Sequence, residues 1–148
     1  MDKHMVIMIG IQASGKSTFF QKHLKENYIH INLDTLKTRN RESQLLEECL
    51  KKGVNIAIDN TNPTKADRKK YILAAKDNGY KVTGYFMQSR LRDCITRNSL
   101  RQGDKKIPDI AIAATSNKLE IPSHIEGFDQ LYFVSISDGD FIISEWRE

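Results

Sequence analysis

Residues 5–17 read Met-Val-Ile-Met-Ile-Gly-Ile-Gln-Ala-Ser-Gly-Lys-Ser, and this stretch decides the fold. Its first five residues are all apolar, which is typical of a central parallel strand that is buried on both faces. Gly10 to Ser17 then fits the phosphate-loop pattern G-x-x-x-x-G-K-S/T at every defined position. Apolar side chains recur at helical spacing from Lys16 to Lys25. A strand, a glycine loop and a helix in this order predict a nucleoside triphosphate site. A chance glycine loop at the end of a strand is the alternative.

The residue types in this loop suit the binding of phosphate. Two glycines let the backbone turn tightly enough to point successive N–H groups at an anion, and the following helix adds its positive N-terminus. Lys16 supplies a positive charge to the β- and γ-phosphates, and the Ser17 hydroxyl is placed to bind Mg²⁺. We therefore expect ATP and Mg²⁺ as ligands, with nucleotide contacts at Gly10, Ala13, Ser14, Gly15, Lys16, Ser17 and Thr18.

The composition is that of a compact enzyme domain. The 148 residues are 39% hydrophobic and 28% charged, values that exclude a disordered chain. No apolar run is long enough to span a membrane, and Met1 to His4 lead into a short strand rather than a secretory signal, so we expect a cytoplasmic (intracellular) protein. Cys49 and Cys94 lack metal-ligand spacing and are expected to be buried, reduced thiols. The net charge of +4 and the pI near 9.0 suggest an anionic partner.

The rest of the chain has a regular alternation of strands and helices. Strands are predicted to start near residues 5, 28, 54 and 81, at spacings of 28−5=23, 54−28=26 and 81−54=27 residues, the length of one strand and one returning helix. A fifth strand is predicted at 131–134, and a short final strand or hairpin around 140–146. We therefore expect a single α/β domain over residues 1–148, with a doubly wound parallel sheet of about five strands, the P-loop kinase (P-loop NTPase) fold.

In such a sheet, ligands bind beyond the carboxyl ends of the strands, so residues just after each strand are candidates for the site. Asp34 follows the predicted second strand, where it either caps the next helix or accepts a proton from a hydroxyl that attacks the γ-phosphate. Asp59 ends the apolar third strand, where it can hold a Mg²⁺-bound water or orient a substrate hydroxyl. A turn built from Asp, Asn and Pro is the alternative for Asp59, and the phosphate loop upstream favours the functional interpretation.

Basic residues form two groups. Arg97 and Arg101 lie four apart on a helix predicted over 90–102, which puts them on one face, and the segment around 97–108 is a candidate lid over bound ATP. An arginine on a mobile lid meets the charge that develops on the transferred phosphoryl group. A solvated basic helix face is the plainer alternative. The second group is expected to face solvent and consists of Lys65, Arg68, Lys69 and Lys70.

Four ordered segments carry a resemblance to a known family. They are the loop 10–18, the stretch Tyr28 to Asn32 with Asp34, the run Ile58 to Asn62, and Arg97-Asn98-Ser99-x-Arg101 with Ile107-Pro108. The turn Glu126 to Asp129, before the last core strand, also fits. From Met5 to about Phe133, the chain resembles the kinase domain of the polynucleotide 5′-hydroxyl kinase family, whose members are P-loop kinases.

The resemblance implies an activity and a set of site residues. It implies an ATP-dependent phosphotransferase that uses Mg²⁺ and takes the 5′-hydroxyl end of DNA or RNA as acceptor. Asp34 would be the general base, Lys16 would bind ATP, and Arg101 would be the lid arginine. The implied nucleotide contacts include Arg97 and Arg101, the implied metal ligands are Ser17 and Asp59, and the implied acceptor contacts are Asp34, Lys37, Asp59 and Thr61.

The chain departs from the family pattern at two acceptor positions. Leu33 occupies a position that is commonly Arg, and Lys37 stands where the family has an Arg that grips acceptor phosphate. An ammonium group cannot form the bidentate fork of a guanidinium, so we expect a weaker hold on a nucleic-acid backbone. No Asp-x-Asp phosphatase motif follows an apolar strand, since Asp138-Gly139-Asp140 falls at a predicted terminal turn. Any 3′-phosphatase or ligase partner is therefore expected on another chain.

Three functions remain open from the sequence. A polynucleotide 5′-hydroxyl kinase is favoured, and a P-loop kinase for a small metabolite, such as a sugar acid or an antibiotic, shares the same donor site. A nucleotide-dependent switch or binding module is disfavoured. The stretch Asn117 to Glu120 ends in Glu where guanine recognition needs Asp, and no D-x-x-G motif follows the phosphate loop. The sequence chooses neither DNA over RNA nor an oligomeric state.

Overall fold

A six-stranded sheet with the order β2-β3-β1-β4-β5-β6 forms the centre of the protein. The computed structural model describes residues 2–148, apart from the side chain of Asp104. Neighbouring strands run parallel except β6, which pairs antiparallel with β5. The strands are β1 (Lys3–Ile9), β2 (Ile29–Ile31), β3 (Ile56–Ile58), β4 (Tyr80–Met87), β5 (Gln130–Ser137) and β6 (Asp140–Glu145). The predicted α/β fold is confirmed, and the predicted final hairpin supplies the sixth strand.

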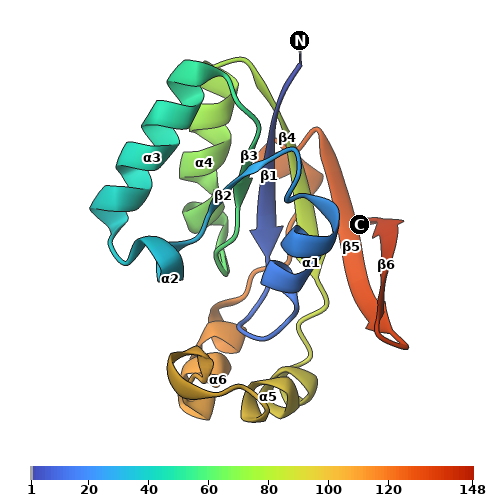
Figure 1. Cartoon of the computed structure of the whole chain (residues 1–148). Helices are drawn as coiled ribbons and strands as arrows, with labels where there is room; N and C mark the ends of the chain where they lie inside the picture. The colour runs from blue at the N-terminus through green and yellow to red at the C-terminus, as the bar shows by residue number, and fades with distance from the viewer. Residues whose placement is uncertain (1) are drawn as a thin grey trace.

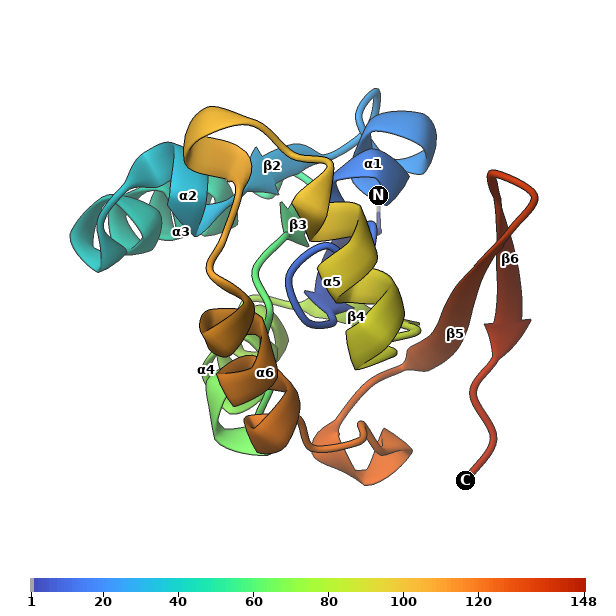
Figure 2. The ribbon, with the colours of Figure 1, turned by 90° about the horizontal axis from the view of Figure 1, so that it is seen from below.

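Helices cover both faces of the sheet and its carboxyl end (Figure 1). They are α1 (Lys16–His23), α2 (Leu33–Leu36), α3 (Arg39–Lys52), α4 (Lys65–Asp77), α5 (Leu91–Ser99) and α6 (Asp109–Lys118), with short 3₁₀ turns η1 (Gly103–Lys105) and η2 (His124–Glu126). Figure 2, seen from below, shows α5 in front of β4, with α6 beside α5 and in front of α4, and hydrogen bonds join both helices to the phosphate loop. These two helices therefore lie at the edge where the phosphate loop begins.

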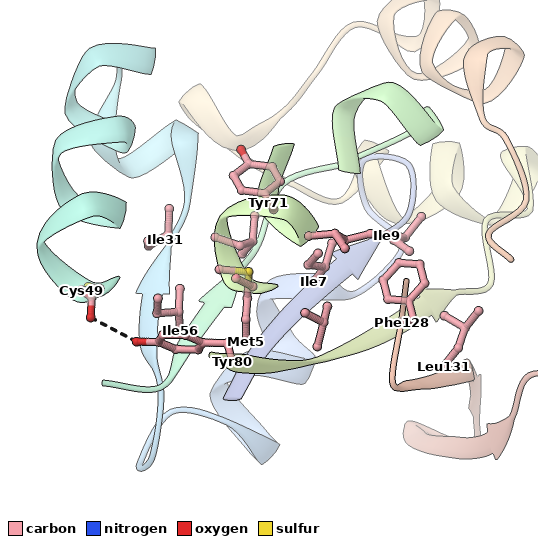
Figure 3. Close-up of a cluster of buried hydrophobic side chains, with 14 of the residues drawn as sticks. Met5, Ile7, Ile9, Ile31, Cys49, Ile56, Tyr71, Tyr80, Phe128 and Leu131 are labelled. Carbon is pink, nitrogen blue, oxygen red and sulfur yellow. Dashed lines mark hydrogen bonds between the residues drawn. The ribbon is translucent and has the colours of Figure 1, made fainter. Parts of the chain in front are cut away.

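The central strand β1 is buried on both faces, because its side chains point alternately into two hydrophobic clusters, one on each face of the sheet. Met5, Ile7 and Ile9 belong to a cluster with side chains of α3 and α4 (Figure 3). Val6 and Met8 point the other way, into a cluster with the aromatic side chains of α1. Fully burying an apolar side chain of this size contributes about 1.5–3 kcal/mol. The apolar run therefore fixes β1 at the centre of the sheet, and the phosphate loop follows from its end.

Helix ends follow local side-chain chemistry. The Thr38 side chain accepts a hydrogen bond from Arg41 N and starts α3, which ends at Gly53 with a left-handed φ of 68°. A reciprocal capping box between Thr64 and Asp67 starts α4. The predicted helix end at Gly53 is confirmed, whereas α6 was not predicted.

Two sequence expectations about the basic helices are wrong. The helix predicted over 90–102 ends at Ser99, because Leu100 N and Arg101 N bond to carbonyls only three residues back. Arg101 therefore follows α5 and does not share a helix face with Arg97. Arg68, expected to face solvent, is fully buried and forms two hydrogen bonds with the Glu126 carboxylate. Its three basic neighbours on α4 are exposed, as expected.

Both cysteines, Cys49 and Cys94, are buried and free, as the sequence predicts. Among residues 2–148, no helix has the length and apolar character needed to cross a membrane. The predicted terminal turn is confirmed at Asp138 and Gly139, which join β5 to β6 with positive φ angles of 52° and 81°.

Candidate active site

The phosphate loop between β1 and α1 is built around two glycines that cannot be replaced without strain. A Cβ atom added to Gly10 would lie 2.6 Å from Ser14 Oγ and 3.0 Å from Met87 Cβ. Gly15 has a φ of 101°, which side chains rarely tolerate, and it sits at the N-terminus of α1. The backbone therefore turns tightly here and directs the start of α1 toward the space at the end of the sheet.

Hydrogen bonds with four other segments hold this loop in place. Gly10 N donates to Thr61 O after β3, and Ile11 N donates to Ser89 Oγ after β4. From the helices, Gln12 Nε2 donates to a hydroxyl of α6, and Arg97 Nη1 of α5 donates to Ala13 O at 2.9 Å. The loop is thus tied to β3, β4, α5 and α6. Thr61 and Arg97, both predicted as site residues, contact the loop itself.

Lys16 lies buried beneath the loop that precedes it. Its Nζ donates to Gly10 O at 2.8 Å and to Ile11 O at 2.9 Å. Burial lowers the pKa of Lys16 from 10.5 to about 8, while the carboxylates of Asp59 and Asp34 oppose this shift and Arg101 adds to it.

Asp59 forms the polar centre of the site. Ser17 Oγ donates to Asp59 Oδ2 at 2.9 Å, and His30 Nε2 lies 2.6 Å from the same oxygen. Burial alone would raise the pKa of Asp59, but the contact with His30, the charge of Lys16 and the hydrogen bond from Ser17 hold that pKa below its ordinary value. Asp59 is therefore an anion at neutral pH, placed one hydrogen bond from the first turn of α1.

Unsatisfied polar atoms concentrate at this site. Within the described part of the chain, four buried side-chain nitrogen or oxygen atoms lack a hydrogen-bond partner, and three of them belong to Gln12, Ser14 and Asp59. Buried polar atoms without partners are costly and are seldom left in a folded protein. Their position in and beside the phosphate loop is what a site shaped for a polar ligand requires.

The oxygen atoms around Asp59 fit a magnesium ion. Asp59 Oδ1 is buried and without a partner, and the Ser17 hydroxyl touches the other carboxylate oxygen. Among the described residues, no group of three or more His, Cys, Asp or Glu side chains could hold a metal. A cation here would therefore be held by few protein oxygens, which suits Mg²⁺ because it keeps waters and binds substrate phosphates.

Asp34 lies on the four-residue helix α2 and is exposed. The predicted capping role of Asp34 is wrong, because the Asn32 side chain caps α2 by accepting from Thr35 N at 3.1 Å. Asn32 also donates to Asp59 O at 2.8 Å, which links the ends of β2 and β3. Lys37 follows α2 with a φ of 76°, and its side chain is exposed. The structure thus leaves the Asp34 carboxylate available to solvent beside the loop.

The buried side-chain amide of Asn98 joins the two ends of the predicted lid segment. Asn98 is fully buried; its Oδ1 accepts from Ile107 N at 2.9 Å and its Nδ2 donates to Ile107 O. This pair joins the two ends of the excursion 99–106. Arg101 lies within it, exposed, with its Nη1 donating to Lys105 O at 3.3 Å. The guanidinium of Arg101 thus lies on an exposed loop whose ends are fixed.

Sequence reasoning missed two residues of the site. His30 contacts Asp59 and stacks on Phe20 with ring centroids 3.9 Å apart, although the four histidines are scattered along the chain. A polar residue between two isoleucines near the carboxyl end of a strand could have revealed it. Asn98 lies between two arginines in the sequence, and nothing else near it predicted its hydrogen bonds to Ile107.

The fold and the site agree with comparisons to known proteins. Residues 5–122 match the family model of the AAA domain. Over 140 residues, the chain is 34% identical to a protein of Acanthamoeba polyphaga mimivirus assigned as a bifunctional polynucleotide phosphatase/kinase, covering 90% of this chain and 33% of that protein. It is also 29% identical to the bifunctional polynucleotide phosphatase/kinase of Schizosaccharomyces pombe, covering 99% of this chain and 38% of that protein. The chain thus spans about a third of each curated relative, and the resemblance predicted from the sequence is confirmed.

Solved structures support the fold at lower sequence identity. A complex of AvrRxo1-ORF1 and AvrRxo1-ORF2 with ATP matches with a TM-score of 0.73 at 13% identity, over 96% of this chain and 57% of that one. A gluconokinase from Sinorhizobium meliloti 1021 matches with a TM-score of 0.64 at 15% identity, over 92% and 84% of the two chains. With its phosphate loop, parallel sheet and family match over residues 5–122, this chain belongs to the AAA domain family.

Proposed function

We propose that this chain is an ATP-dependent kinase that transfers the γ-phosphate to the 5′-hydroxyl end of DNA or RNA. The observation that carries the proposal is the anchoring of Asp59 beside the phosphate loop, with Asp34 exposed just beyond the end of the neighbouring strand. Ser17 Oγ donates to Asp59 Oδ2 at 2.9 Å, and Asn32, two residues before Asp34, donates from Nδ2 to Asp59 O at 2.8 Å. A phosphate site beside a second, exposed carboxylate suits transfer to a hydroxyl. The names of the curated relatives supply the acceptor class.

The donor half of the reaction falls to the phosphate loop. The N–H groups at the start of α1 would bind the phosphates of ATP, and the Lys16 amine would exchange its two carbonyl partners for phosphate oxygens. Ser17 and Asp59 would hold Mg²⁺, which would supply positive charge to offset that of the phosphates. His30 would keep the Asp59 carboxylate turned toward Ser17.

The acceptor half falls to Asp34. Its carboxylate would accept the proton of the acceptor hydroxyl as the hydroxyl oxygen forms a bond to the γ-phosphorus. The bond from that phosphorus to the bridging oxygen breaks at the same time, and ADP leaves with the electron pair. The products are a 5′-phosphate end, ADP and a proton, which Asp34 passes to water. Its exposure leaves room for the end of a polymer to reach it.

The segment 97–108 would act as the lid of this site. Arg97 fixes its start through the bond to Ala13 O, and the Asn98–Ile107 pair holds its base. Arg101 would turn from the Lys105 carbonyl toward the phosphoryl group, since its side chain is exposed on the loop and makes one long hydrogen bond there, at 3.3 Å. A guanidinium in that place stabilises the charge that grows on the phosphoryl oxygens.

A panel of acceptors tests the proposal. The protein would be incubated with γ-labelled ATP and Mg²⁺ together with 5′-hydroxyl DNA or RNA oligonucleotides, or with small alcohols that include gluconate. We expect label at the 5′ end of the oligonucleotides and none on matched oligonucleotides that already carry a 5′-phosphate. Label confined to a small alcohol would replace the proposal with a metabolite kinase. Label on no acceptor would remove both.

A further inference from the structure

A buried carboxylate on α3 lies outside every catalytic role assigned above. The Glu42 side chain is 3% exposed and lies near the start of α3, with one cation beside it, Arg39 at 3.1 Å. It also accepts from the Tyr71 hydroxyl at 2.8 Å and from Asn60 Nδ2 at 2.7 Å. Burying a carboxylate is costly unless several donors satisfy it. Three donors from three different segments converge here, so the Glu42 carboxylate ties these segments together.

Asn60 extends this network to the proposed acceptor site. Its Nδ2 donates to Glu42, and its Oδ1 accepts from Leu33 N at 2.9 Å. Leu33 is the first residue of α2 and directly precedes Asp34. Because the NH₂ side of the amide must face a carboxylate, the carbonyl side must face Leu33. The charge of Glu42 therefore sets the orientation of Asn60, and Asn60 sets the position of the backbone that carries Asp34.

The network adds to the other contacts that hold α2. The helix has only four residues, none of them fully buried. Leu36 packs against the core cluster, Asn32 caps the first turn, and Asn60 holds Leu33 N. Tyr71 stiffens the network, since its ring belongs to the core cluster and its hydroxyl points away from the other labelled side chains (Figure 3). Burial, and then the hydrogen bond to Glu42, raises the pKa of the Tyr71 hydroxyl, which therefore remains a donor.

We propose that Glu42 and Asn60 are positioning residues of the acceptor site, which hold α2 so that Asp34 meets the acceptor hydroxyl. The inference rests on the proposed function for its role in catalysis. It predicts that the network affects the step that uses the acceptor and leaves the binding of ATP unchanged. A misplacement of about 1 Å at a catalytic group lowers rates by on the order of a hundredfold.

Single variants test the orientation argument. Glu42→Gln removes the charge that orients Asn60, and Asn60→Asp keeps an acceptor for Leu33 N but sets a second carboxylate against Glu42. We expect each to lower kcat with a 5′-hydroxyl oligonucleotide by about ten- to a hundredfold, with the ATP dissociation constant unchanged. Glu48→Gln is the matched control, because Glu48 lies on the same helix, exposed and paired only with Lys52. It should act like the wild type.

The double variant Glu42→Gln/Asn60→Asp separates positioning from a general loss of stability. It exchanges the amide and the carboxylate, so a donor again faces an acceptor and an oxygen again faces Leu33 N. We expect kcat to recover to within about threefold of the wild type, although each single variant is impaired. If the fold-loss of kcat in the double variant equals the product of the losses in the two single variants, the proposal is overturned.

Amide exchange tests the network without reference to catalysis. Hydrogen exchange at the Leu33 N–H, followed by NMR, should be faster in both single variants than in the wild type. It should return to the wild-type rate in the double variant and stay at that rate in Glu48→Gln. If the wild type phosphorylates no nucleic acid, the proposed function fails. The exchange rate of the Leu33 N–H still decides whether Glu42 and Asn60 hold α2. Unchanged Leu33 exchange in Glu42→Gln and Asn60→Asp would contradict the inference even in an active kinase.

Discussion

The nucleotide half and the acceptor half of this site are built in different ways. The nucleotide half is one continuous segment, residues 10–17, in which Lys16 is buried and which is held by bonds to β3, β4, α5 and α6. The acceptor half is an exposed carboxylate on a four-residue helix, held by side chains up to 27 positions away. In the proposed mechanism, a contiguous motif therefore places the phosphates, whereas a dispersed network places the carboxylate that meets the hydroxyl.

Removing the charge of the nucleotide half should have the largest effect. Lys16→Ala should lower transfer by about 10³-fold or more, because the variant loses the ammonium group that lies under the loop and would meet the phosphates. The fold should survive, since Lys16 bonds only to carbonyls of its own loop. Steady-state transfer and circular dichroism check the two parts. Near-normal transfer by this variant would remove the loop from the mechanism.

Arg101, the arginine of the proposed lid, should have the next largest effect. Arg101→Ala should lower kcat by about 10²–10⁴-fold and change ATP affinity less, because its charge acts on the growing charge of the phosphoryl group. Arg101→Lys should recover only part of this loss, since an ammonium lacks the guanidinium fork.

Lys69→Ala is the control for the lid variants, because Lys69 is exposed on α4. It should act near the wild type in steady-state kinetics at saturating ATP. If Arg101→Ala matched this control, the segment 97–108 would be an ordinary basic surface.

Burial of Lys16 should appear as a pH dependence of stability without ATP. The pKa falls from 10.5 to about 8 on folding, so between these values the unfolded chain binds more protons and stability rises with pH. Relative to Lys16→Met, the unfolding free energy of the wild type should therefore rise by up to about 3 kcal/mol between pH 7 and pH 10.5. Urea unfolding at several pH values measures it. For exposed Lys69→Met, the difference in unfolding free energy from the wild type should not change with pH. The same constancy for Lys16→Met would show that folding does not lower the pKa of Lys16.

The parts of the molecule that the sequence predicts are those that depend on neighbours in the chain. The apolar run of β1, the two glycines and the helix end at Gly53 each follow from local rules, and the structure has them where expected. Local rules failed for Arg68, because it lies in a run of basic residues on a helix, a pattern that predicts exposure to solvent. Its partner Glu126 lies 58 positions away, so no local pattern could indicate the pair.

The acceptor half resisted sequence reasoning for the same reason. Asp34 was recognised as a candidate base, but the residue that caps its helix is Asn32, and the residues that orient it are Asn60 and Glu42. These contacts span 18 and 27 positions and join α2, α3 and the end of β3. Only the folded sheet brings the ends of β2 and β3 together, so the network becomes visible in the structure alone.

The most direct test of the two-half account is Asp34→Asn, with transfer and ATP affinity measured on the same preparation. Because Asp34 neither caps α2 nor is buried, the variant should keep the stability of the wild type. We expect transfer to a 5′-hydroxyl oligonucleotide to fall by about a hundredfold or more, while the ATP dissociation constant changes by less than about twofold. Transfer within a few-fold of the wild type, or a parallel loss of ATP binding, would contradict the account.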